Sequence, residues 1–103
     1  MTIPQPEHIS REDLAERLRQ EVSSLIGADL EWWTSHSVSP FPVTHGVASH
    51  FVVASSGQSI LFFADDEDEF GVARLAASRQ SMTDYGLIGD LKDAIRVIQT
   101  IVA

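Results

Sequence analysis

The densest group of side chains that could do chemistry is a run of five carboxylates, which we call the acidic turn. It consists of Asp65, Asp66, Glu67, Asp68 and Glu69. A calcium-binding helix-loop-helix needs oxygen ligands at alternate positions, Gly at the sixth and Glu at the twelfth. Counted from Asp66, Gly71 fits, but Phe70 is the fifth residue and Ala77 the twelfth. The spacing favours a hydrated turn or a contact for a basic partner, and a weak divalent-cation site stays open.

Three histidines, His36, His45 and His50, lie within a short stretch of the chain. Imidazoles beside carboxylates can bind zinc or iron, but no HExxH or HxH pattern occurs and the chain has no cysteine. The sequence therefore predicts no metal and no cofactor. The histidines remain candidates for the lining of a ligand pocket or for acid-base chemistry, together with Trp32.

Signatures of catalysis are absent from the sequence. There is no GxSxG nucleophile elbow, and the glycines form neither a GxGxxG nor a Walker A loop. Adjacent carboxylates on a turn point in different directions, so they do not form an acid-base pair in a cleft. The sequence therefore favours a protein that is not an enzyme.

Two adjacent tryptophans, Trp32 and Trp33, lie in residues 29–34, which we expect to be a short strand. In an extended segment only one ring can face the core. Trp33 is then a candidate contact for a partner, unless the loop around residues 40–43 covers it.

The net charge of −8 originates in the middle of the chain. No Lys or Arg lies between Arg19 and Arg74, whereas the segments outside that interval carry seven basic and seven acidic residues. Nucleic acid needs a basic patch, so it is a poor partner, and a basic protein surface would be attracted.

Helical periodicity marks both ends of the chain. Ser10 can cap a helix over residues 10–26 that Gly27 ends, and Asp13 can pair with Arg17 one turn further on. A second apolar face recurs at helical spacing over residues 90–102.

Between the helices, β-prone segments at residues 47–54, 59–64 and 70–76 are separated by short turns, which predicts an antiparallel meander. Residues 35–46, with Pro40 and Pro42, and residues 77–85 are expected to be loops. The predicted fold is α+β: an N-terminal helix, a three- or four-stranded antiparallel meander and a C-terminal helix, with the helices on one face of the sheet.

At 103 residues the chain has room for one core. We expect a flexible lead-in at residues 1–9 and a single domain at residues 10–103. No signal peptide or membrane span is visible, so a cytoplasmic location is expected.

Two short segments of the chain resemble a strand pair of one known superfamily. They are Ile60-Leu61-Phe62-Phe63-Ala64-Asp65-Asp66 and Phe70-Gly71-Val72. That superfamily joins fungal cell-wall synthesis regulators with bacterial immunity proteins against toxins. Glu67-Asp68-Glu69 replaces its glycine-rich turn, so no site residue is carried over. The opening helix, the sheet and the acidity also resemble small type III secretion chaperones.

The sequence thus favours a small, acidic, non-catalytic binding protein that recognises a basic protein surface, such as that of a toxin or an effector. In this hypothesis the acidic turn is dispensable for folding, because its charges repel one another. One alternative is a homodimer that pairs through the broad face of the last helix or a sheet edge. Another is a ligand-binding or enzymatic pocket near the three histidines.

Overall fold

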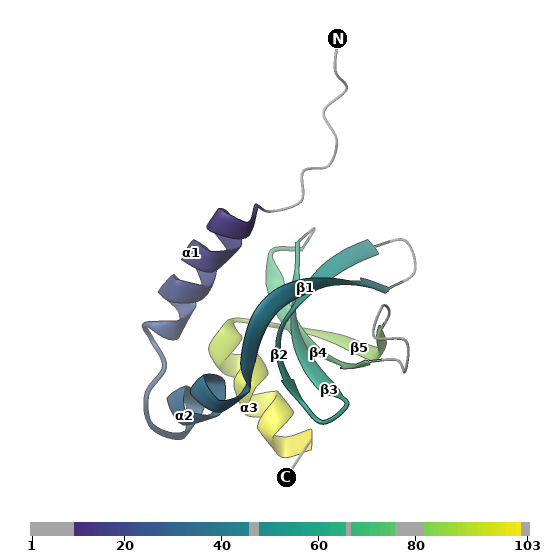
Figure 1. The fold of residues 1–103 in the computed structure, drawn as a ribbon. Coiled ribbons are helices and arrows are strands. Elements are labelled where there is room, and N and C mark those ends of the chain that lie inside the picture. The colour runs from purple at the N-terminus through teal and green to yellow at the C-terminus, as the bar shows by residue number, and fades with distance from the viewer. Residues whose placement is uncertain (1–9, 46–47, 66, 76–81, 102–103) are drawn as a thin grey trace.

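The computed structural model describes residues 10–45, 48–65, 67–75 and 82–101 (Figure 1). The predicted lead-in, residues 1–9, lies outside them. The elements are α1 (Arg11–Val22), α2 (Gly27–His36), β1 (Ser37–His45), β2 (Ala48–Ser56), β3 (Ser59–Ala64), β4 (Glu69–Leu75), β5 (Met82–Gly89) and α3 (Leu91–Ile101). The α+β class, the antiparallel sheet and a helix near each end are confirmed. The meander has five strands, so the prediction of three or four was too low.

The strands lie in the sheet in the order β1-β2-β3-β4-β5, and each neighbouring pair is antiparallel. The three predicted strands correspond to β2, β3 and β4. β3 has the predicted bounds, and the boundaries of β2 and β4 are shifted by one or two residues. The β3–β4 pairing runs without a bulge from Ser59 opposite Arg74 to Ala64 opposite Glu69. This regular pairing fixes the position of the acidic turn at one end of the sheet.

The predicted strand at residues 29–34 is wrong, because these residues belong to α2. Gly27 opens this helix with a φ of 56°, a left-handed conformation that glycine adopts without strain. Asp29 lies in the first turn, where the helix dipole favours a negative charge, and its carboxylate accepts hydrogen bonds from Arg96 and Gln99 of α3. These contacts across the interface stabilise helix in a segment whose tryptophans also suit a strand.

Residues 35–46 were predicted as a loop, whereas most of them form β1. Pro40 and Pro42 cannot donate hydrogen bonds, which argues against a central strand. β1 is an edge strand with one partner, β2, and its register shifts between Ser37 and Phe41. An edge position with a bulge is where a sheet tolerates proline.

The prediction of a loop at residues 77–85 is wrong in part, because some of these residues form a strand. β5 begins at Met82 and pairs with β4 through two register shifts, while residues 76–81 lie outside the described ranges. α3 begins at Leu91, near the expected start of the last helix.

α1 begins as predicted, with the Ser10 hydroxyl accepting a hydrogen bond from the amide of Asp13 at 3.1 Å. It ends at Val22, earlier than predicted. The hydroxyls of Ser23 and Ser24 donate to carbonyls of the last turn, which stabilises this early end. In the described ranges, no helix has the length and apolar character needed to cross a bilayer.

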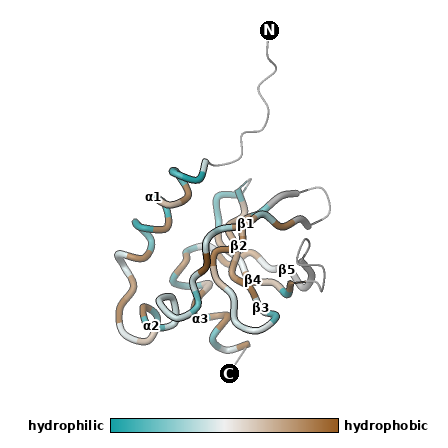
Figure 2. Tube along the Cα trace, viewed as in Figure 1, coloured by the Kyte–Doolittle hydropathy of each residue, from teal (hydrophilic) through white to brown (hydrophobic). Residues whose placement is uncertain are grey.

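The main core lies between the helices and one face of the sheet. Figure 2 shows hydrophobic residues concentrated along the central strands. The apolar stripe of α3 is buried there, and it consists of Leu91, Ala94, Ile95 and Ile98. Leu61, Phe63 and Phe70 meet it from the sheet, which confirms the prediction that the apolar face of the last helix is core.

The other face of the sheet has a second core. It consists of Val43, Val52, Ile60, Phe62, Ala64 and Ala73, all at most 2% exposed. The sheet curls around these residues, and its two edge strands, β1 and β5, come into contact. β3 is therefore buried on both faces, which accounts for its uninterrupted apolar sequence.

We predict that Gly71→Ala destabilises the fold, because the ring of Phe62 packs directly on Gly71. A Cβ at position 71 would lie 2.5 Å from both the Phe62 ring and the carbonyl oxygen of Gly86. The expected loss is about 1–3 kcal/mol in the free energy of unfolding, measured by denaturant titration. Gly86→Ala is the matched control, because its Cβ would meet only the Val72 carbonyl oxygen at 4.0 Å. Equal stability of the two variants would contradict the tight packing.

We also predict that Ile95→Asp unfolds the domain. Ile95 is fully buried, so an unpaired charge there should cost on the order of 3 kcal/mol or more. Thr100→Asp, at an exposed position of the same helix, should leave the circular dichroism spectrum and the melting transition nearly unchanged. A folded and equally stable Ile95→Asp variant would show that α3 does not pack as described.

Candidate functional site

The acidic turn joins β3 to β4 at one end of the sheet. Glu67 and Asp68 are exposed, and Asp65 and Glu69 are half-buried. Asp66 lies outside the described residues. Asp68 has a φ of 55°, a left-handed conformation that Asp adopts more readily than most residues.

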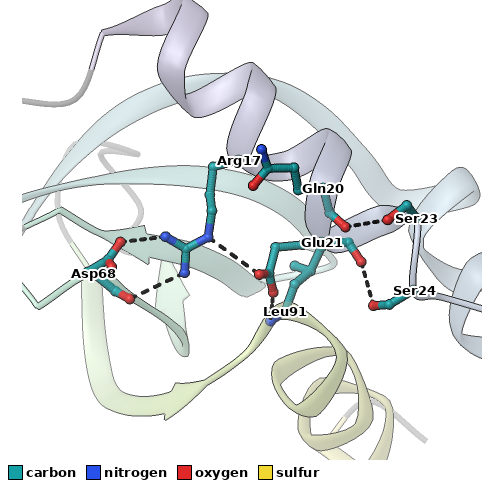
Figure 3. A network of polar contacts seen from close by, with 7 residues as sticks. All are labelled: Arg17, Gln20, Glu21, Ser23, Ser24, Asp68 and Leu91. Atoms are coloured by element: carbon teal, nitrogen blue, oxygen red, sulfur yellow. Dashed lines mark hydrogen bonds and ion pairs between the residues drawn. The ribbon is translucent and has the colours of Figure 1, made fainter.

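Arg17 of α1 holds the turn through Asp68 (Figure 3). Its Nη1 donates to Oδ1 of Asp68 at 2.5 Å, and its Nη2 donates to the Asp68 carbonyl oxygen at 3.4 Å. The guanidinium also lies 5.4 Å and 5.6 Å from the ring centres of Phe63 and Phe70. A planar guanidinium can stack on rings while its edge donates hydrogen bonds, so one side chain joins α1 to both the sheet and the turn.

Glu21 extends this network to α3. Its Oε2 lies 3.4 Å from Nε of Arg17, and its Oε1 accepts a hydrogen bond from the amide of Leu91 at 3.0 Å. That amide is among those a helix leaves without a partner at its start, where a negative charge also suits the helix dipole. The sequence predicted that Arg17 would pair with Asp13. That pairing is wrong, because Arg17 contacts Glu21 and Asp68 instead.

The network leaves the acidic turn with an excess of negative charge. Arg17 is shared between the carboxylates of Asp68 and Glu21, so its single positive charge only partly offsets the negative charge of the turn. Exposed Asp90 precedes α3, whose first amide the network reaches. Such a surface can attract cationic groups, with Asp68 held in place and Glu67 exposed beside it.

His36 and His50 lie in different parts of the fold. His36 ends α2, where its ring stacks on Trp32 with centroids 4.5 Å apart and its Nδ1–H donates to the Trp32 carbonyl oxygen at 2.8 Å. His50 is buried on the curled face of the sheet, beside the ring of Phe62. His45 belongs to β1, but its side chain lies outside the described set. Across the described residues, no group of three or more potential ligands could hold a metal ion.

The two tryptophans lie on α2 rather than on opposite faces of a strand. Trp32 is buried in the main core, and Trp33 is half-buried and packs against the same core. Neither lines the described cavities beside β1 or α3. This arrangement favours the covered interpretation of Trp33, although a contact with a partner through its exposed part stays a prediction.

Sequence reasoning missed the roles of Arg17 and Glu21. No local pattern could have shown them, because Arg17 and Asp68 are 51 positions apart and Glu21 and Leu91 are 70 apart. Only the packing of α1 across the end of the sheet brings them together. The acidic turn itself was visible as a run of one residue class.

Comparisons with models of protein families, with curated proteins and with solved structures find no match to this chain. The functional interpretation therefore depends on the geometry of the site.

We predict that Asp68 stabilises the fold only while Arg17 is present. Asp68→Asn keeps the tolerance for a positive φ, so it tests the ion pair without adding backbone strain. The side chain of Asp68 is 73% exposed, so a double-mutant cycle with Arg17→Met should give a coupling energy of only about 0.2–1 kcal/mol. Glu67→Gln is the matched control and should show no coupling to Arg17. Zero coupling for Asp68 as well would contradict the proposed anchor.

Proposed function

We propose that this chain is a small, non-catalytic binding protein whose acidic turn recognises a basic surface on another protein. The observation that carries the proposal is the anchoring of Asp68 by Arg17. A turn of like charges would otherwise spread to reduce its repulsion. Holding one member in place gives a partner a charged surface of fixed shape, which lowers the entropy lost on association.

The distribution of charge supports the same proposal. The middle of the chain supplies the whole net charge of −8, and the four described carboxylates of the acidic turn lie at one end of the sheet. Such a field speeds the encounter with a basic protein and opposes binding to nucleic acid. A toxin or an effector, met in the cytoplasm, is one partner that fits this chemistry.

A homodimer is the alternative, and the fold restricts how it could form. The apolar face of α3 is already buried against its own sheet, and the two edge strands lie close to each other. A dimer would have to use the apolar side chains that remain exposed, which include Ile26 and Ile101. Analytical ultracentrifugation over a range of concentrations tests this alternative directly.

An enzymatic pocket near the histidines has less support, because His36 and His50 face different parts of the fold. The cavity beside β1 is lined by helix α1 and strands β1 and β2, and no histidine is among its described lining residues.

We predict that neutralising the acidic turn slows association with a basic partner. The variant carries Asp66→Asn, Glu67→Gln and Glu69→Gln, which removes three charges and keeps Asp68 on Arg17. A basic protein isolated by pull-down from the native host supplies the partner. Its association rate, followed by stopped-flow fluorescence, should fall several-fold at low salt and approach the parent rate at high salt, because ions screen the attraction.

A matched control removes three exposed carboxylates elsewhere, through Glu12→Gln, Asp13→Asn and Glu31→Gln. It has the same net charge as the turn variant, so any difference between the two reports where the charges lie. Equal rates for both variants at every salt concentration would overturn the proposal.

A further inference from the structure

An apolar groove of about 290 Å³ lies between α1 and the first two strands. Its walls include Leu14, Ala15 and Leu18 from α1, Pro40 and Pro42 from β1, and Phe51 from β2. Leu14 is buried, Leu18 and Phe51 are half-buried, and Ala15 is exposed. The groove therefore lies along an edge of the main core that α1 covers only in part.

The charged residue in the described lining of this groove is basic, although the protein as a whole is acidic. Arg11 lines it and shares one stripe of α1 with Leu14, Ala15 and Leu18, at spacings of three, four and seven residues. Arg11 is exposed, and it forms no ion pair within the described part of the chain.

The acidic residues of α1 lie away from this stripe. Glu12, Asp13 and Glu16 fall on another arc of the helix, because each residue turns it by about 100°. Glu16 is also paired with Arg19, and its hydrogen bonds and charge raise the pKa of Arg19. The groove thus combines apolar walls with a cationic group that forms no ion pair with any residue the structure describes.

We infer that the groove binds a small amphipathic carboxylate, whose apolar chain lies along the proline and leucine walls while its carboxylate meets Arg11. A volume near the lower end of the about 300–1,000 Å³ typical of small-molecule sites suits a medium-length chain. A cationic amphiphile would be repelled by Arg11, and a neutral one would gain no attraction from it. The inference is independent of the acidic turn, so either can fail without the other.

The test is isothermal titration of the full chain with decanoate, with decyltrimethylammonium as the cationic counterpart of equal chain length. Decanoate should bind saturably, and the cation should bind more weakly. Arg11→Gln should weaken decanoate binding about two- to fivefold, as expected for an exposed ion pair. Arg11→Glu should reverse the preference between the two ligands. Equal binding of both ligands by the parent protein would overturn the role of Arg11.

Variants that fill the groove distinguish binding in the groove from binding elsewhere on the protein. Ala15→Trp places a large ring between the walls, and Ser39→Trp does so from the strand side, so each should weaken decanoate binding by at least about tenfold. Ala28→Trp, at an exposed position of α2, is the control and should bind like the parent. Thermal melts identify any variant that has lost its fold.

Unchanged binding in a folded Ala15→Trp or Ser39→Trp variant would overturn the inference. A second result would also overturn it: the parent protein binds no decanoate, and the groove-filling variants lose self-association in sedimentation. That result would assign the groove to a second copy of the chain.

Discussion

A sheet of five strands in a short chain has two apolar faces to bury, and the three helices group on one side of it (Figure 1). The second face is buried by the sheet itself, which curls until its edge strands come into contact. That curl depends on close packing at its centre, where Phe62 lies over Gly71 and a methyl group would collide with both the ring and the next strand. β3 is consequently inaccessible on both faces, and the described turn residues Glu67 and Asp68 and the outer side of α1 are exposed.

Arg17 links this architecture to the charge of the protein. Its guanidinium lies over the rings of Phe63 and Phe70, donates hydrogen bonds to Asp68 and forms an ion pair with Glu21. The sequence suggested that the acidic turn is dispensable for folding, whereas the structure shows that Asp68 contacts α1. Asp68 has a structural contact, whereas no such contact is described for Glu67.

The sequence predicted those parts of the fold whose signals are local. Ser10 marked the start of α1. The Val- and Phe-rich segment of β2, the apolar run of β3 and the alternation in β4 marked the central strands. α2 and β1 were misassigned because their structure is decided by distant partners: Asp29 is held by α3, and Pro40 and Pro42 are tolerated because β1 is an edge. The same limit applies to the site. The short spacing of the histidines in the sequence did not indicate which way their side chains point. His50 points into the curled core because it pairs with Val43, whose side chain is buried there.

The two ends of α1 can serve different chemistry because distance and direction separate them. Arg11 and Arg17 are six residues apart, or about 9 Å along a helix axis, which is similar to the screening length at physiological salt. They also point to different sides, since Arg17 faces the acidic turn while Arg11 shares the stripe that lines the groove. Arg17 is neutralised by its carboxylates, so its charge does not reach the groove, and the carboxylates it holds do not neutralise Arg11. A basic residue can thus bind an anion within a strongly acidic protein. The distant carboxylates are screened by salt, so the nearby guanidinium determines the local charge.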